Sequence, residues 1–137
     1  MKRDYNKGFV LSLVDSFNYA INGLVTAVGT ERNIKIHYGI AIIVLFSSLF
    51  FDLSRVEYII LLFTVTLVIV AELINTAIEK TIDLITEEYH PLAKVVKDIA
   101  AGAVLLAALN SIAVGYLLFF DRLDAVRNIV ILRITNS

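Results

Sequence analysis

Residues 71–83 read A-E-L-I-N-T-A-I-E-K-T-I-D, and this stretch decides how the chain folds. It places the carboxylate of Glu72 between two uncharged runs, residues 58–71 and 73–78. A carboxylate at membrane depth costs about 2.5 to 3.5 kcal/mol even on a permissive insertion scale. Because a hydrophobic segment keeps such a residue when it is useful, function is sought here first.

The composition of the whole chain indicates a small integral membrane protein. Of its 137 residues, 58% are hydrophobic and only 18% are charged, and the mean hydropathy is +0.81. Soluble domains carry about 25% charged residues. The absence of cysteine excludes disulfides and a thiol nucleophile, and the net charge of −1 argues against a nucleic-acid partner. The length suits one domain, residues 1–137.

Three apolar segments are predicted to cross the membrane as helices. They cover residues 34–51, 56–85 and 92–120. A hydrocarbon core about 30 Å thick needs roughly 20 residues, and backbone amides in lipid must find partners within the segment. Ser54 and Glu57 have capping-box spacing, and Pro91 stands where a helix would begin. Residues 121–137 form a tail to which the sequence assigns no role.

Residues 5–29 are predicted to form an amphipathic helix that lies in the membrane interface. Apolar side chains recur at three- and four-residue spacing from Phe9 to Val28, and polar side chains fill the other faces. A helix packed on the rest of the protein is the alternative reading of this pattern.

The distribution of basic residues predicts the orientation of the chain. Eight lysines and arginines lie before the first apolar segment or around the second loop, residues 86–98, and the other four lie on the opposite side. Because cytoplasmic flanks carry the excess of basic residues, the N-terminus is expected in the cytoplasm. The chain is then a multi-pass protein of the inner (cytoplasmic) membrane.

Polar residues of the second segment fall on one face of the predicted helix, within about 100° on a helical wheel. They are Glu72, Asn75, Thr76, Glu79 and Asp83. The next helix begins with three charged residues at i, i+3 and i+4. These are Lys94, Lys97 and Asp98. Antiparallel neighbours joined by a short loop bring the two sets together at the cytoplasmic boundary.

This constellation suits a site for magnesium and phosphate. Carboxylates at a water boundary are the hard oxygen ligands that Mg²⁺ prefers, often together with substrate phosphates. A lysine beside them binds phosphate oxygens as a point charge. Glu72, the deepest carboxylate, is suited to act as a general base. Glu31 and His37 precede the first segment on the same predicted side and are further candidate ligands.

Two rival interpretations use the same residues. Glu72 alone is compatible with a structural pair or hydrogen bond inside a membrane oligomer. The acidic stripe is also compatible with the proton or cation path of a small transporter. A conduction path should continue with polar residues, yet Ile59 to Val70 offer only Thr64 and Thr66. The sequence contains no glycine-rich phosphate loop and no protein-kinase motif.

Several motifs nevertheless resemble one family. They are the stretch from Glu72 to Asp83, the triplet Glu88-Tyr89-His90, the A-K-x-x-K-D pattern from Ala93 to Asp98, the E-R-N-I-K-I-H segment from Glu31 to His37, and Y-A-I-N-G from Tyr19. Over roughly residues 9 to 120 the chain resembles the prokaryotic diacylglycerol kinase and undecaprenol kinase family. The resemblance implies an all-α fold with an interfacial helix, three transmembrane helices and a homotrimer with shared active sites.

The resemblance also implies an activity, a lipid kinase of phospholipid metabolism. Such an enzyme transfers the γ-phosphate of ATP, with Mg²⁺, to the hydroxyl of a membrane lipid. The E-R-N-I-K-I-H segment is more similar to the undecaprenol kinase branch, so undecaprenol is the first expected substrate and diacylglycerol the second.

Small residues recur every fourth position on the third segment, which suits contact between subunits or packing within one. They are Ala103, Ala107, Ser111 and Gly115.

Roles carry over from the family position by position. Glu72 matches the general base that takes the lipid hydroxyl proton, and Asn75 matches a polar residue beside the substrate. Glu31 and Glu79 match metal ligands that also contact ATP. The remaining nucleotide contacts match Tyr19, Glu88, Tyr89, His90, Lys97 and Asp98. Ser12 stands where family members often carry an arginine that contacts nucleotide or substrate, so that contact is absent from the expected set.

Overall fold

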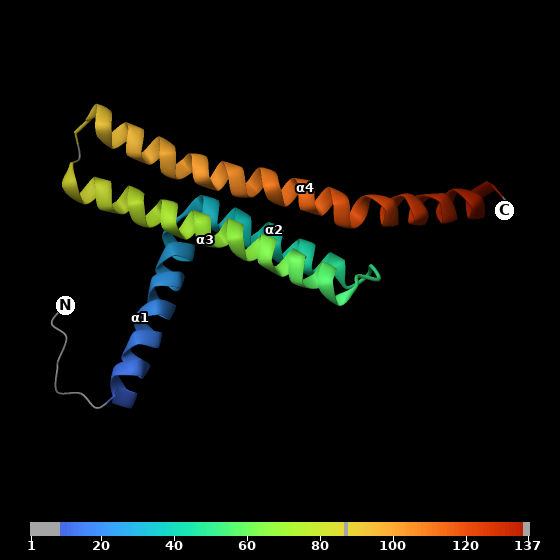
Figure 1. The fold of residues 1–137 in the computed structure, drawn as a ribbon, viewed down its shortest axis with the longest axis horizontal. Coiled ribbons are helices and arrows are strands. Elements are labelled where there is room, and N and C mark those ends of the chain that lie inside the picture. Colours follow the sequence, from blue (N-terminus) through green and yellow to red (C-terminus); the bar gives the residue numbers. More distant parts are fainter. Residues whose placement is uncertain (1–8, 87, 136–137) are drawn as a thin grey trace.

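The computed structural model describes residues 9–86 and 88–135, and all regular structure within these ranges is helical. Four helices follow one another along the chain. They are α1 (Phe9–Thr30), α2 (Arg32–Ser48), α3 (Arg55–Ile85) and α4 (Pro91–Thr135). In Figure 1, α3 and α4 run antiparallel and side by side, α2 lies along α3, and α1 projects away from this layer.

Local signals account for the positions of α3 and α4. The predicted capping box is confirmed: the Ser54 hydroxyl accepts the Glu57 N–H at 3.3 Å, and the Glu57 carboxylate accepts the Ser54 N–H at 2.7 Å. Pro91 is the first residue of α4, where its missing N–H costs nothing. The local signals therefore account for the first residues of both helices, Arg55 of α3 and Pro91 of α4.

The helix boundaries differ from the predicted segments in two places. α2 ends at Ser48 rather than at residue 51, and the chain turns through residues 49–54 before α3 begins. α4 does not end where the charged residues resume at 121 but continues to Thr135, past the α2–α3 turn (Figure 1). An uncharged run marks a change of solvent, which does not require the backbone to leave the helix. Residues 5–8 of the predicted interfacial helix lie outside the described residues.

Two of the described helices are long and apolar enough to cross a membrane, Arg55–Ile85 and Pro91–Phe120. Only 33% and 11% of their most apolar windows are buried by the rest of the chain. Large side chains such as Ile42, Phe63 and Leu106 likewise point outward. A fold that exposes this much apolar surface is suited to lipid rather than to water. The 17 residues of α2 span about 25 Å, slightly less than the hydrocarbon core.

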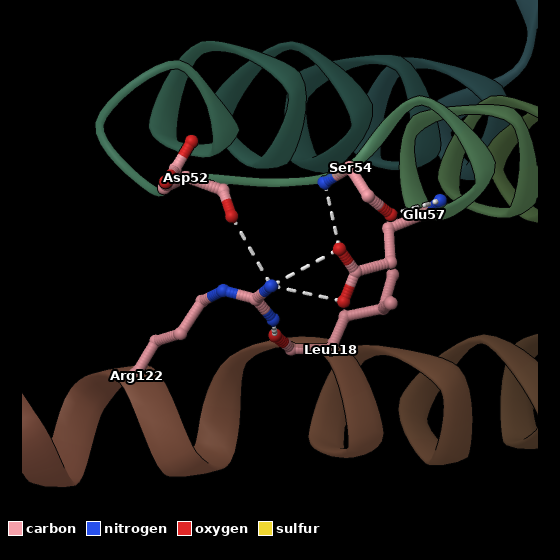
Figure 2. Close-up of polar contacts among 5 residues, drawn as sticks. All are labelled: Asp52, Ser54, Glu57, Leu118 and Arg122. Atoms are coloured by element: carbon pink, nitrogen blue, oxygen red, sulfur yellow. Dashed lines mark hydrogen bonds and ion pairs between the residues drawn. The ribbon is translucent and has the colours of Figure 1, made fainter.

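An arginine on α4 joins this helix to the start of α3 and to the turn that precedes it. Figure 2 shows the Arg122 guanidinium between α4 and the turn that leads into α3. The guanidinium donates to both carboxylate oxygens of Glu57, at 2.9 and 3.0 Å, and to the Asp52 carbonyl at 3.2 Å. It also donates to the Leu118 carbonyl on its own helix. These contacts define the Arg122 cluster: Asp52, Ser54, Glu57, Leu118 and Arg122. Leu53, Leu61 and Leu118 pack beside it as a small core.

Candidate active site

The polar face predicted for α3 changes from buried to exposed along the helix. Glu72, Asn75 and Thr76 are buried, with 3% of Glu72 and 6% of Asn75 exposed, whereas Glu79 is half-buried and Asp83 is exposed. The 31-residue helix carries this face without interruption because its residues recur at three- and four-residue spacing. Glu72 is therefore buried deep in the protein, and the carboxylates of Glu79 and Asp83 become more exposed towards the end of α3.

Asn75 connects the deep part of this face to the next turn. Its side-chain amide donates to the Glu79 carboxylate at 3.0 Å, a contact that the i, i+4 spacing allows. Its side-chain carbonyl oxygen is buried and has no hydrogen-bond partner among the described residues. Because buried acceptors normally have partners, this oxygen is suited to accept a hydrogen bond from a substrate or to face a cation.

Glu31 approaches α3 from the junction of α1 and α2. It occupies the N-cap position of α2, yet its side chain makes no capping hydrogen bond. The carboxylate instead contacts the Lys80 ammonium at 2.7 Å and accepts the Thr30 hydroxyl at 3.1 Å. The Lys80 ammonium, followed by the Thr30 hydroxyl, holds the pKa of the Glu31 carboxyl below its usual value. Glu31 is thus ionised, and its partner Lys80 directly follows Glu79 in the sequence.

A cleft of about 500 Å³ opens where α3 turns into α4, and we call it the turn cleft. Five of the residues predicted to contact nucleotide line it, with the exposed end of the α3 polar face. Its charged and aromatic lining is Asp83, Glu88, Tyr89, His90, Lys94, Lys97 and Asp98. Lys97 is ion-paired with Asp83 across the two helices, and Lys94 is paired with Asp98 along α4. The cleft therefore contains both cations and carboxylates at its mouth.

The predicted residues do not all meet in one place. Glu88, Tyr89, His90, Lys97 and Asp98 share the turn cleft, while Glu72, Asn75 and Glu79 follow α3 away from it. Tyr19 is exposed on α1, and none of the hydrogen bonds or ion pairs described above involves it. His37 lines a separate cavity of about 280 Å³ between α2, α3 and α4, rather than the surroundings of Glu31. Ser12 is exposed on α1.

Lys80 is the contact that sequence reasoning missed. It follows Glu79 directly, but its partner Glu31 lies before α2, so no helical periodicity links them. Its position beside a candidate metal ligand was the only local signal. Thr86 was missed as well: it lines the turn cleft, and its hydroxyl accepts the Glu88 N–H at 3.2 Å.

The side chains fit a magnesium ion that arrives with a phosphate substrate. Within the described residues no three His, Asp or Glu side chains are grouped as a complete metal site. Mg²⁺ is usually held by only one or two carboxylates, with water and substrate phosphates completing its shell. Glu31 and Glu79, together with the unpartnered Asn75 oxygen, offer oxygen ligands of that kind. A bound phosphate would complete the coordination shell of a cation held by these groups.

Comparisons with known proteins point to a single family. The family model described as prokaryotic diacylglycerol kinase matches residues 18–119. An undecaprenol kinase from Bacillus subtilis (strain 168) is 43% identical over 108 residues, covering 79% of this chain and 88% of the relative. A diacylglycerol kinase from Synechocystis is 42% identical over 105 residues, covering 76% and 60%, and one from Haemophilus influenzae is 31% identical over 109 residues, covering 79% and 92%.

Proposed function

The chain belongs to the prokaryotic diacylglycerol kinase family and is a lipid kinase, and we propose that it transfers the γ-phosphate of ATP to undecaprenol. Diacylglycerol is the second candidate acceptor. The relative named undecaprenol kinase and the E-R-N-I-K-I-H segment at Glu31 support this order. Both acceptors present one hydroxyl at the membrane surface, so the same site chemistry serves either.

The observation that carries the proposal is the order of groups along α3. The turn cleft, with Tyr89 and Lys97, provides aromatic and cationic contacts for a nucleotide. Glu79 lies one turn from Asp83, about 6 Å along the axis, and Glu72 lies about 10 Å farther. A nucleotide whose base occupies the cleft would direct its phosphates along α3 towards Glu72. The deepest carboxylate then meets the end of the triphosphate.

The acceptor has an apolar path to the same place. A groove of about 410 Å³ runs between α3 and α4, and nine of its ten lining residues are apolar. Asn75 is the tenth, and it carries the unpartnered oxygen described above. A lipid chain in this groove would bring its hydroxyl to Asn75 at the deep end of the polar face. The groove thus supports a lipid rather than a water-soluble acceptor.

In the proposed reaction Glu72 accepts the proton of the lipid hydroxyl as the hydroxyl oxygen bonds to the γ-phosphorus. The bond from the γ-phosphorus to the oxygen bridging the β-phosphate breaks, and ADP leaves. Lys97 neutralises phosphate charge from the turn cleft, and Asn75 orients the acceptor. Glu31 and Glu79 would hold Mg²⁺, which when bound neutralises charge on the phosphates. Most of the catalysis then consists of positioning and charge neutralisation.

The membrane arrangement is part of the proposal. We propose that α1 lies in the interface, that α2, α3 and the first part of α4 span the inner membrane, and that the N-terminus is cytoplasmic. The turn cleft then opens to the cytoplasm, where ATP is available. We also propose that the protein is a homotrimer with active sites shared between subunits. The outward apolar side chains of α2 to α4 are suited to both lipid and subunit contact.

The transporter alternative is not favoured. Beyond Glu72 towards the start of α3, polar residues are sparse, and the Thr64 hydroxyl is already bound to the Ile60 carbonyl at 2.8 Å. A polar path across the membrane therefore ends near Glu72. A site that opens on one side and ends inside fits transfer to a lipid better than conduction.

Reconstitution in vesicles tests the proposed function. Purified chain is supplied with labelled Mg-ATP and either undecaprenol or diacylglycerol, and label in the lipid fraction is measured. We expect phosphorylation of both lipids, with the higher kcat/KM for undecaprenol; vesicles without an acceptor are the control. If neither lipid is labelled, the kinase proposal is overturned. A higher kcat/KM for diacylglycerol would reverse the order of substrates.

A further inference from the structure

The ion pair between Lys80 and Glu31 is a contact that the proposed function leaves unexplained. Its ammonium lies 2.7 Å from a carboxylate oxygen of Glu31, the residue proposed to hold a divalent cation. The Lys80 side chain is 53% exposed, and that of Glu31 is 28% exposed. A divalent cation that binds Glu31 would therefore compete with a cation that the chain itself supplies.

Glu31 does not depend on Lys80 for its position. Its backbone N–H donates to the Ala27 carbonyl at 2.9 Å, which continues the hydrogen bonding of α1. Its side chain also keeps the Thr30 hydroxyl. The neighbouring Lys35 ammonium donates to the Gly29 carbonyl at 2.9 Å and makes no ion pair with Glu31. Lys80 consequently contributes charge to Glu31 rather than an anchor.

The pair is of a kind that exchanges easily. Water screens an ion pair between exposed side chains, and such pairs contribute little stability. A divalent cation carries twice the charge and prefers carboxylate oxygens. The lysine side chain is long and flexible, and it binds phosphate as a point charge. Asp83 and Glu79 also attract the Lys80 ammonium.

We propose that Lys80 is an exchangeable counter-ion of Glu31. Its ammonium neutralises Glu31 before Mg-ATP binds, and it moves to the phosphate oxygens of the nucleotide once the divalent cation has taken the carboxylate. This inference rests on the proposed function for the identity of the nucleotide. It assigns a phosphate-binding role to a residue outside the predicted site and makes Lys80 a competitor of the metal.

The two halves of the exchange have opposite signs in one variant, Lys80→Gln. Without nucleotide, Mn²⁺ binding to the purified full chain is followed by the electron paramagnetic resonance signal of free Mn²⁺. Loss of the competing ammonium should strengthen Mn²⁺ binding by about threefold, because the exposed pair is weak. The affinity for Mg-ATP, measured by equilibrium binding, should fall by about tenfold, because one charged phosphate contact is lost.

Two further variants separate the exchange from general effects. Lys80→Arg keeps the charge and should return both affinities towards the wild-type values. Lys35→Gln removes a charge near Glu31 that forms no ion pair with it, so both affinities should change less than in Lys80→Gln. A fall in both affinities together would overturn the exchange and indicate that Lys80 has a structural role between α2 and α3. Unchanged affinities, or no Mn²⁺ bound by any variant, would overturn it equally. The Mn²⁺ measurement needs no lipid phosphorylation, so its outcome is independent of the kinase assay.

Discussion

Charged side chains lie at both ends of α3, but their partners are arranged differently. At the first end, the Arg122 cluster is closed: the guanidinium contacts Glu57, Asp52 and Leu118, and Glu57 also accepts the Ser54 N–H. At the other end, the turn cleft is open, and each ion pair in it joins only two side chains. The exposed fractions are 30% for Arg122 and 26% for Glu57, against 61% for Asp83.

The difference teaches how to separate structural charges from binding charges in this fold. A cation that donates to several protein acceptors holds helices together, and a ligand would have to break several hydrogen bonds to reach it. A cation with one exposed partner beside a cleft of about 500 Å³ can change partners at little cost. On this basis we assign a structural role to the Arg122 cluster and propose the turn cleft as the binding site.

The strongest test of this distinction replaces Glu72, the proposed general base in the middle of α3, and compares it with a glutamate of the Arg122 cluster. Glu72→Gln should lower kcat for lipid phosphorylation by about 10² to 10⁴, the usual contribution of a general base. Nucleotide affinity should stay nearly unchanged, because the buried Glu72 does not line the turn cleft. Label incorporation and equilibrium nucleotide binding measure the two quantities.

The matched control for this prediction is Glu57→Gln, the same change in the Arg122 cluster. Its kcat per folded molecule should equal that of the wild type. If the two variants lose turnover equally, the division of α3 into a structural and a catalytic end is wrong.

A second test addresses the open pairs of the turn cleft. Lys97→Gln should raise the KM for ATP by about tenfold, the loss expected for one charged contact to phosphate. At saturating ATP, kcat should change much less, because Lys97 is proposed to bind rather than to transfer a proton. Lys94→Gln offers a comparison, since its partner Asp98 lies on the same helix. A larger change in kcat than in KM for Lys97→Gln would place this lysine in the chemical step instead.

The smallest effect is expected at the closed end. Arg122→Gln removes the contacts that tie α4 to the α2–α3 turn and should lower the thermal unfolding midpoint by about 2 to 5 °C. Activity per folded molecule should be retained. Circular dichroism during heating measures the first quantity and the vesicle assay the second. A selective loss of ATP affinity in this variant would show that the closed cluster communicates with the turn cleft.

Much of the site was predictable because it lies within single helices. Glu72, Asn75 and Glu79 fall on one face through helical spacing alone, and the Asn75 to Glu79 hydrogen bond is an i, i+4 contact. The turn between α3 and α4 is short, so Glu88, Tyr89 and His90 had to lie near the start of α4. The His90 ring accepts the Leu92 N–H at 3.2 Å, which ties the end of the turn to the first residues of α4.

The remaining contacts depend on how helices rotate and pack, which local spacing does not encode. Lys80 was placed on α3 by its position, but its pairing with Glu31 requires the α1–α2 junction to approach that side of α3. Lys97 had an acidic neighbour in sequence, Asp98, yet it pairs with Asp83 across the turn. Arg122 was assigned to a tail without a role, and it joins three parts of the chain.

The sequence by itself determined the helical content, the start of α3 and α4, the polar face from Glu72 to Asp83 and the family. Each of these follows from spacing of four residues or fewer, or from motifs that are matched directly. Only the tertiary structure decided which charges are satisfied by protein and which remain open at a cleft. The physical reason is that a charged side chain pairs with groups on whichever helix packs beside its own. In this protein those groups lie far away in the sequence.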